Sequence, residues 1–502
     1  MKRPSIRRAP RNPQRVGRSA AVCCTPSVPT IVLSNRVLTA AGVFAPAALV
    51  IEGGVITDIL PQDVARSAWP QAPVDDLGDH WLTPAMVDGH THVALHALRG
   101  VLSGDSTRGN VVEDLFYRFE SGLDAAEVRA FARMGAWEAL LHGTGCVFDH
   151  YFHAPAVAEA LVEVGLTGVV APTLQDLGGP FAHASDEGLA DVERLDSPSW
   201  AERGIVAALG PHAMDTVSRE LWRQIADVAQ RRELPVHVHV AQSLEEVQRV
   251  SGRHGHSPVQ ELLATGVLDA APRALLVHMI YADGADLAAL RGGRALLGHC
   301  PHSAFVFGHP ARVDRWRDLP WLVGSDCAAS NDAMDVRGEL RVVHGLAAWA
   351  SAGSAAYTRF AGGDSLGGGE AWRERGRIRA AAPELLEPAS LLGRVTTTPG
   401  TFHPRQLTGT LAPGALANLA VWDAEHPVFW PALDPLRAIV LGNASAALLH
   451  VMTRGEWRGE RGRFAQSLRR SELYRAHREE ASQRLHQRLQ RLGLQLAPLG
   501  QG

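Results

Sequence analysis

Residues 84–92 read Pro-Ala-Met-Val-Asp-Gly-His-Thr-His and end an apolar run that begins at Trp81. The run predicts a buried strand. Side chains two residues apart on a strand point to the same side, so His90 and His92 converge beyond its carboxyl end. Neutral imidazoles bind zinc and similar metals, and parallel barrels keep their chemistry at the carboxyl ends of their strands. An isolated pair of this kind is more often part of a polar loop, so the interpretation depends on the other strand ends.

The composition of the 502 residues is that of an ordinary globular protein: 46% are hydrophobic, 20% are charged and the net charge is -4. A charge so close to neutral gives no electrostatic reason to expect nucleic acid as a partner. No apolar run approaches the ~18 residues of a membrane helix, so no membrane association is predicted. The five cysteines are odd in number and form no Cys-x-x-Cys pair, which disfavours a disulfide framework and predicts a reducing, cytoplasmic location.

The central part of the chain alternates short apolar runs with helical stretches, which is typical of a parallel α/β fold. One helix is predicted over Asp124–His142, with Asp124 as its cap. About eight strand-and-helix units over ~300 residues fit a (β/α)8 TIM barrel. The predicted strands are residues 81–87, 145–148, 168–171, 205–208, 235–240, 274–278, 295–298 and 321–323.

Short strands near both ends of the chain predict a composite β-sandwich built from N- and C-terminal segments, since chain termini often meet in space. The N-terminal strands are 31–33, 37–38, 48–51 and 55–56, with a Gly53-Gly54 hairpin turn between the last two, and the C-terminal strands are 419–422, 438–440 and 448–451. The predicted organisation is a disordered basic tail at 1–28, sandwich segments at 29–83 and 404–464, a TIM-barrel domain at 84–403, and a C-terminal helix and tail at 465–502.

Four later strand ends carry residues that could complete a metal site with the first histidine pair. These are His239, His278, His299 and Asp326. Each alone is more often structural, but together they predict a metal-dependent active site, because this fold assembles its site from those ends. His237 is assigned to the opposite face of its strand and to a structural role.

The motifs at these strand ends resemble those of the amidohydrolase superfamily, in the branch of guanine and adenosylhomocysteine deaminases and triazine chlorohydrolases. Residues 84–92 resemble the family's Pro-Gly-x-x-Asp-x-His-x-His segment. Three further stretches are similar to family motifs: His299-Cys-Pro-His-Ser303, Gly324-Ser-Asp-Cys-Ala-Ala-Ser-Asn-Asp332 and Leu411-Ala-Pro-Gly-Ala-Leu-Ala-Asn-Leu419. The resemblance covers nearly all of residues 30–464.

This resemblance implies a hydrolase that uses one divalent metal ion, with zinc as the default and iron as the alternative. His90, His92, His239 and Asp326 would bind the ion and leave a position for water, giving a metal-bound hydroxide. Asp326 would also accept the water's proton, and His278 would contact the water or the developing anion. The implied reaction is hydrolysis of a non-peptide C–N bond in a small heterocycle, that is, hydrolytic deamination.

Gln242 departs from the family pattern, in which a glutamate stands three residues after the strand histidine and carries a proton to the leaving group. An amide cannot do this at neutral pH, and the loss of a general acid typically costs ~10²–10⁴-fold in rate. Gln242 is therefore a catalytic position whose role is open. The alternatives are hydrolytic dehalogenation or amide hydrolysis by the same site, or a metal-containing binding protein that has lost turnover.

The surroundings of the site are predicted more coarsely. His150, His299, Ser325 and Asn331 are placed around the metal ligands or in the substrate pocket, and the segment 96–120 is expected to cover the substrate. The run Ala304-Phe-Val-Phe307 suggests an apolar pocket wall. Leucines at helical spacing in 463–496 predict a surface-packed or interface helix, which would suit a homo-oligomer.

Overall fold

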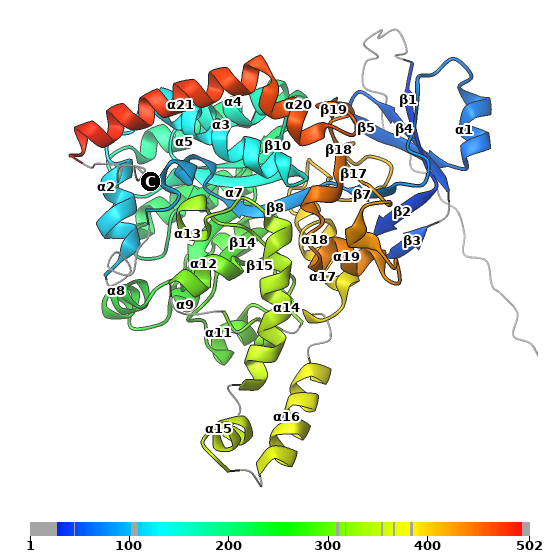
Figure 1. Ribbon diagram of the computed structural model, residues 1–502. Coiled ribbons are helices and arrows are strands. Elements are labelled where there is room, and N and C mark those ends of the chain that lie inside the picture. Colours follow the sequence, from blue (N-terminus) through cyan, green and yellow to red (C-terminus); the bar gives the residue numbers. More distant parts are fainter. Residues whose placement is uncertain are drawn as a thin grey trace, which may run out of the picture.

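Parallel strands form the centre of the computed structural model, which describes residues 28–44, 46–101, 109–307, 311–316, 318–352, 355–364, 367–381 and 385–493 (Figure 1). One parallel sheet has the order β11-β10-β9-β8, with β12 beside β10, and a second has the order β13-β14-β15-β16. The mixed α/β fold with parallel sheets was thus correctly predicted. The strands are β8 (Met86–Thr91), β9 (Thr144–Tyr151), β10 (Thr167–Leu174), β11 (Ile205–Ala207), β12 (Gly210–Pro211), β13 (Val236–Val240), β14 (Ala274–His278), β15 (Ala295–His299) and β16 (Trp321–Val323).

Isolated parallel bridges join the edges of the two sheets. Thr91 at the end of β8 pairs with Asp326 beyond β16, and Leu209 pairs with Val236 at the start of β13. β8 and β16 approach so closely that a Cβ on Gly324 would lie 2.6 Å from the backbone nitrogen of His90. Glycine is therefore required where β8 and β16 meet, a contact that is called the seam below. The seam places Thr91 at the end of β8 beside Asp326, three residues after β16.

The parallel strands are buried along their lengths, which explains why their sequences are continuous apolar runs rather than alternating ones. Alternate residues of several strands share one apolar cluster, including Val87, Phe148, Val169, Leu275 and Leu322. The opposite faces join a larger cluster with the surrounding helices. The strands are thus held between two apolar layers.

Helices follow most of the parallel strands. α3 begins as predicted. The Asp124 side chain accepts from the backbone N–H of Glu127, and the Glu127 carboxylate accepts from the backbone N–H of Asp124, which makes a capping box. The helical segments before β16 are η1 (Val93–Leu98), η3 (Val112–Phe116), α2 (Tyr117–Glu120), α3 (Ala125–Leu141), α4 (Ala154–Val164), α5 (Ser185–Leu195), α6 (Pro198–Glu202), α7 (Arg219–Arg232), α8 (Leu244–His254), α9 (Pro258–Ala264), α10 (Val267–Ala270), α11 (Gly284–Ala289), α12 (Pro301–Val306) and η4 (Val313–Arg315).

Further helices follow β16, and α14 runs away from the sheets to the pair α15 and α16 at the lower end of the view (Figure 1). α21 lies along α3 on the opposite side. These helices are α13 (Ala328–Asn331), α14 (Val336–Ala352), α15 (Ala355–Ala361), α16 (Gly368–Ala381), α17 (Pro388–Arg394), α18 (Thr397–Gly400), η7 (Pro427–Phe429), α19 (Pro435–Leu441), η8 (Ala444–Ala447), α20 (Phe464–Arg470) and α21 (Glu472–Arg491).

Strands from both ends of the chain share one mixed sheet, with the order β19-β18-β17-β7-β2-β3. A second sheet has the order β5-β4-β1-β6, and one apolar cluster includes side chains from both sheets. α1 (Gln62–Ala68) packs on β4. The strands are β1 (Thr30–Ser34), β2 (Arg36–Thr39), β3 (Gly42–Phe44), β4 (Ala47–Glu52), β5 (Val55–Leu60), β6 (Val74–Asp76), β7 (Trp81–Pro84), β17 (Leu419–Trp422), β18 (Leu448–Thr453) and β19 (Glu456–Arg458).

Two sequence predictions about strands are wrong. The run Trp81–Val87 is not one strand: β7 ends at Pro84 and β8 starts at Met86 in another sheet. The predicted strand 438–440 is part of helix α19, because Asp434 caps its first turn and Pro435 stands at the first helical position. The predicted tail up to residue 27, with Cys23 and Cys24, and Leu496 lie outside the described residues.

Candidate functional site

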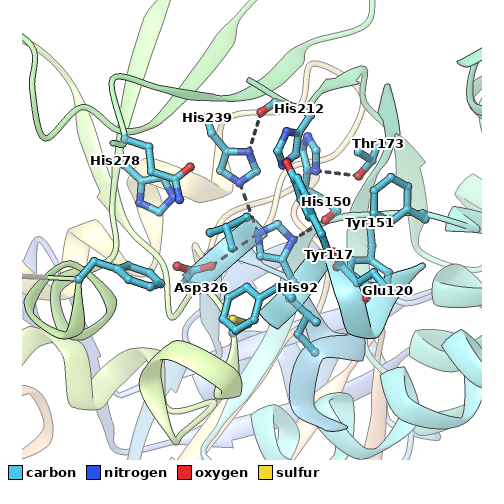
Figure 2. A pocket seen from close by; sticks show the side chains of 17 residues that line it. His92, Tyr117, Glu120, His150, Tyr151, Thr173, His212, His239, His278 and Asp326 are labelled. Atoms are coloured by element: carbon cyan, nitrogen blue, oxygen red, sulfur yellow. Dashed lines mark hydrogen bonds and ion pairs between the residues drawn. The ribbon is translucent and has the colours of Figure 1, made fainter. Parts of the chain in front are cut away.

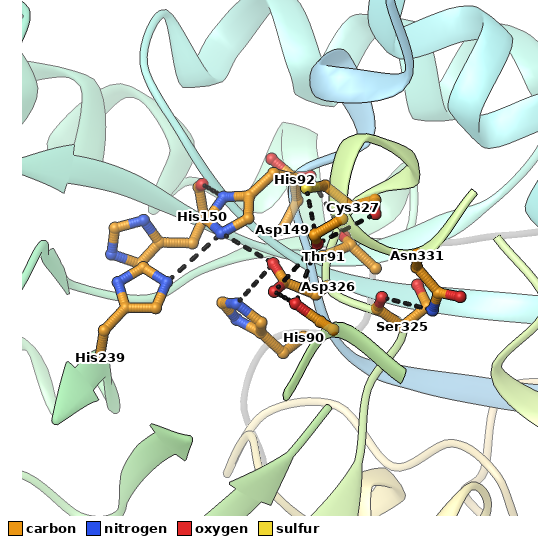
Figure 3. A network of polar contacts seen from close by, with 12 residues as sticks. His90, Thr91, His92, Asp149, His150, His239, Ser325, Asp326, Cys327 and Asn331 are labelled. Carbon is orange, nitrogen blue, oxygen red and sulfur yellow. Dashed lines mark hydrogen bonds and ion pairs between the residues drawn. The ribbon is translucent and has the colours of Figure 1, made fainter. Parts of the chain in front are cut away.

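His90 and His92 stand at the end of β8, where the seam brings them against Asp326 (Figure 3). The Nε2 atoms of His90 and His92 lie 3.7 and 3.5 Å from Oδ1 of Asp326. Asp326 has φ 65°, a left-handed conformation that is uncommon outside glycine. Two backbone bonds of 2.9 Å hold it there, from its N–H to the carbonyl of His90 and from the N–H of His92 to its own carbonyl. The strained aspartate is thus fixed by the strand that carries the histidines.

His239 approaches the same point from the end of β13. Its Nε2 lies 3.3 Å from Nε2 of His92. The outer nitrogens of both rings donate to backbone carbonyls: Nδ1 of His92 to His150 at 2.5 Å, and Nδ1 of His239 to His212 at 2.6 Å (Figure 2). These bonds fix the tautomer in which each Nε2 has a free lone pair. These two Nε2 atoms therefore face one another, and that of His92 also faces Asp326.

His90 is held by another histidine rather than by a carbonyl. Its Nδ1 lies 2.7 Å from Nε2 of His237, and both rings are fully buried. The prediction that His237 points to the opposite face is wrong, because residues two apart on β13 lie on the same side. His237 therefore lies one step deeper than His239 on the side that faces His90.

The second carboxylate oxygen of Asp326 accepts from Ser303 at 2.6 Å, which leaves Oδ1 for the histidines. His278 ends β14 with φ 75°, and its ring stacks on that of His239 at 5.4 Å. Burial lowers the pKa of His278 to about 4, so its imidazole is neutral at neutral pH. Potential ligand atoms of His278, Cys300 and Asp326 lie within 4.8 Å of one another.

These residues fit a divalent metal ion. Ligand atoms of His90, His239 and His278, and also of His90, His92 and Asp326, lie within 4.8 Å of one another. Nε2 of His90 is buried and has no hydrogen-bond partner, although such atoms are nearly always satisfied. Imidazoles with a carboxylate are a typical donor set for zinc. A cation at this point would satisfy the orphaned nitrogen.

The other predicted site residues divide into two groups. His150 lines the hollow beside the histidines, where Thr173 donates to its Nδ1 at 3.0 Å. Ser325 instead directs its hydroxyl to Asp88 at 2.6 Å, and Nδ2 of Asn331 donates to the carbonyl of Ser325 at 2.8 Å. His299 is buried against Trp316. Ser325, Asn331 and His299 are therefore packed behind Asp326 or β15, and none is among the described residues that line the hollow.

Gln242 lines the hollow, two residues after the end of β13. Its backbone N–H donates to Glu246 at 2.7 Å, and the N–H of Ala241 donates to the same carboxylate at 3.0 Å. Burial raises the pKa of Glu246 to about 8. The turn that brings Gln242 to the lining of the hollow is thus fixed by a buried acid.

The hollow extends from the histidines to a wall of aromatic side chains (Figure 2). The segment 96–120, predicted to cover the substrate, supplies part of this wall from η3 and α2, and the predicted apolar run supplies Phe307. The lining residues include Leu95, Phe116, Tyr117, Tyr151, Phe152 and Phe307.

Among the described residues, no helix combines the length and the apolar character that a membrane span requires.

Among the lining residues that were not singled out from the sequence are His212, Glu120 and Thr173, of which Glu120 belongs to the segment 96–120. His212 follows β12, and its Nδ1 bonds to Thr216 at 2.9 Å. Glu120 ends α2 and is almost fully buried, which raises its pKa to about 8. Thr173 lies near the end of β10. His212 has the same signal as the predicted residues, a histidine just beyond an apolar strand, whereas Glu120 has no comparable sequence signal.

The chain is similar to known proteins over most of its length. A family model described as "Amidohydrolase family" matches residues 81–458. A 5'-deoxyadenosine deaminase from Methanopyrus kandleri is 27% identical over 381 residues, 75% of this chain and 80% of that protein. A 5-methylthioadenosine/S-adenosylhomocysteine deaminase from Halobacterium salinarum is 27% identical over 379 residues, 74% of this chain and 80% of that protein.

Solved structures share the fold. An adenosine deaminase from Xanthomonas campestris with bound zinc superposes with a TM-score of 0.74 at 21% identity, covering 91% of this chain and 98% of that one. An atrazine chlorohydrolase from Arthrobacter aurescens with zinc gives a TM-score of 0.72 at 19% identity, covering 91% and 100%.

Proposed function

Because this chain belongs to the amidohydrolase family, we propose that it is a zinc-dependent enzyme that removes an amino group from a small heterocycle by hydrolysis. The prediction of an amidohydrolase-type, metal-dependent hydrolase is confirmed by the family match and by the deaminases among its relatives. The observation that carries the proposal is that ligand atoms of His90 lie close to those of His92 and Asp326 in one group and of His239 and His278 in another, while the buried Nε2 of His90 has no hydrogen-bond partner.

In this proposal one zinc ion is held by His90, His92, His239 and Asp326. When bound, the ion supplies Lewis acidity that lowers the pKa of water toward neutrality. Oδ1 of Asp326 faces the histidines and is the base that would take the proton of the attacking water, while Ser303 holds the other oxygen. Neutral His278, stacked on His239, would donate a hydrogen bond to the charge that develops on the ring.

The aromatic wall would hold the heterocycle by stacking, since flat rings prefer offset or edge contacts with aromatic side chains. Tyr117 and His212 lie with ring centres 6.0 Å apart at one side of the hollow. His212 has its Nδ1 bonded to Thr216. Its other nitrogen would then contact a ring nitrogen or a hydroxyl of the substrate.

Gln242 would orient the substrate rather than carry a proton, because its amide has no titratable proton at neutral pH. His278 would then move the proton to the leaving group. Release of halide needs no such proton, but the sequence relatives are deaminases, and this favours deamination.

For the fold, we propose a closed (β/α)8 barrel beside a composite β-sandwich. The parallel bridges between the two central sheets and the mixed sheet of β7 and β17 support it. The domain boundaries at 83, 403 and 464 are proposed with it. A cytoplasmic location and a homo-oligomeric state stay predictions.

The proposal is tested by measuring metal content and ammonia release from purines, pterins, pyrimidines and triazines. We expect about one equivalent of zinc and ammonia from at least one ring class. His239→Ala and Asp326→Asn should lose both the metal and the activity. His486→Ala, on the exposed face of α21, is the matched control and should lose neither. Metal without ammonia from any ring would refute deamination, and absence of metal would refute the site.

A further inference from the structure

Tyr117 and His212 stand opposite each other where two hollows meet. Tyr117 begins α2 and His212 follows β12, and their ring centres lie 6.0 Å apart (Figure 2). Both side chains line the hollow beside the metal site, and both also line a second hollow that adjoins it. The distance between these two rings therefore sets the width of the joined space.

Arg249 of α8 connects the two segments that carry these rings. Its Nη1 lies 2.5 Å from Oε1 of Glu113 on η3, and 3.1 Å from Oδ2 of Asp215, three residues after His212. One nitrogen thus pairs with a carboxylate on each side of the space. Burial raises the pKa of Tyr117, and the guanidinium opposes that rise, so it also lies close to the phenol.

The Asp215 side of this bridge is firmly held. Asp215 is 7% exposed, and its backbone carbonyl accepts from Arg253, one turn further along α8, at 2.6 Å. The hydroxyl of Thr216 bonds to Nδ1 of His212 at 2.9 Å within the same turn. Two arginines of α8 therefore hold the turn that carries His212.

The Glu113 side is more open to water. The side chains of Glu113 and Arg249 are 37% and 40% exposed, and exposed pairs contribute little free energy by themselves. However, Glu113 and Asp215 bind the same nitrogen, so their carboxylates lie close to each other. Without the guanidinium these two negative charges repel each other, which pushes η3 away from the turn of His212.

We propose that Arg249 is a positioning residue that keeps Tyr117 against His212 and so fixes the width of the space in which a flat ring is bound. Its loss would let η3 move outward together with Tyr117, which follows η3 directly. The effect on the reaction rests on the proposed deamination, whereas the closed wall is a property of the protein without ligand.

The first test compares Arg249→Met with the natural full chain, both loaded with zinc. With any ring that releases ammonia, we expect KM to rise about tenfold or more and kcat to change less than about threefold, because ring binding is weakened and the metal site is not touched. Without ligand, amide exchange should accelerate both in 112–117 and in 212–216. Unchanged exchange in both segments would overturn the proposal.

Two further variants serve as controls. Arg249→Lys retains a compact cation, and because a single nitrogen of Arg249 meets both carboxylates, it should bring KM back to within about threefold of the natural protein. Arg223→Met removes an exposed arginine of α7 that pairs with Glu220, and it should change neither KM nor amide exchange. An equal effect of Arg223→Met and Arg249→Met would contradict the proposed role.

Glu113→Leu separates positioning from direct contact between Arg249 and the ligand. It breaks the pair on the η3 side only, so KM should rise and exchange should accelerate in 112–117 but not in 212–216. A guanidinium that bound the ligand itself would be freed by this substitution, and the resulting fall in KM would overturn the proposal. If no ring releases ammonia, deamination fails, and the exchange pattern alone decides the role of Arg249. The pattern of Glu113→Leu also decides it if Arg249→Met does not fold.

Discussion

Replacement of His237 by phenylalanine tests whether one buried hydrogen bond holds a metal ligand in place. For Nε2 of His90 to bind a metal, its Nδ1 must carry the proton and donate to Nε2 of His237, 2.7 Å away. Phenylalanine keeps an aromatic ring at the site but provides no acceptor. The substitution therefore removes the bond while changing the packing little.

The structure indicates the size of the effect. Loss of the outer partner of a metal-binding histidine typically lowers metal affinity ~10–100-fold, which corresponds to about 1.4–2.7 kcal/mol. His90 is completely buried, so water cannot replace the missing acceptor. We therefore expect the upper end of the range, about 100-fold.

The assay is competition for zinc between each folded variant and a chromophoric chelator. His237→Gln retains an acceptor and should recover most of the affinity, to within about tenfold of the natural protein. His299→Phe is the matched control, because His299 is equally buried and neither ring nitrogen has a hydrogen-bond partner. Zinc binding by His237→Phe that equals the natural protein, or falls no further than that of His299→Phe, would refute the role of the bond.

Four shorter predictions follow from the same structure. Gln242→Glu restores a carboxyl that can carry a proton, and kcat for ammonia release should rise about tenfold or more; a fall would mean that the amide itself contacts the substrate. Arg488→Met removes donors to the carbonyls of Phe119 and Gly122 that fix the end of α2. We expect KM to rise by a larger factor than kcat falls, and amide exchange in residues 117–122 to accelerate. The exposed control Arg478→Met should change neither. Glu120 has a folded pKa of about 8 against 4.5, so the folded state binds more protons and its contribution to stability falls as pH rises from about 4.5 to 8. Glu120→Gln should reduce the loss in Tm over that interval, and an unchanged pH profile would contradict the assignment. Chelation of the metal should abolish ammonia release and lower Tm, and zinc alone should restore both.

The central strands could be predicted because strands buried on both faces have continuous apolar sequences. β14 and β16 have the predicted bounds, and His239, His278 and Asp326 stand at or just beyond strand ends as expected. The two-residue alternation of side chains, applied to His90 and His92, would also have placed His237 correctly. Its misplacement was an error of application rather than a limit of the sequence.

Other features depend on contacts that local patterns do not contain. The break at Ala85 arises because β7 pairs with β17 in one sheet and β8 pairs with β9 in another. The apolar run itself does not indicate which strands its residues will pair with. Glu120 reads as a surface acid at the end of a helix, and only the packing of α2 over the hollow buries it. His212, by contrast, could have been predicted, because it stands just beyond an apolar run as the other histidines do, although β12 itself has only two residues.

The pairing of β7 with β17 has a consequence for the order in which the protein can be completed during synthesis. Ala85 alone separates β7 from β8, so the placement of β7 fixes where the strand of His90 begins. A nascent chain that ends before Leu419 contains all four proposed zinc ligands but lacks the antiparallel neighbour of β7. We expect ribosome-bound chains of that length to bind zinc weakly, and affinity to appear only once β17 has emerged and paired. The proposed zinc ligands His90 and His92 are made early in translation, but their placement depends on β17, which is made near the end of translation.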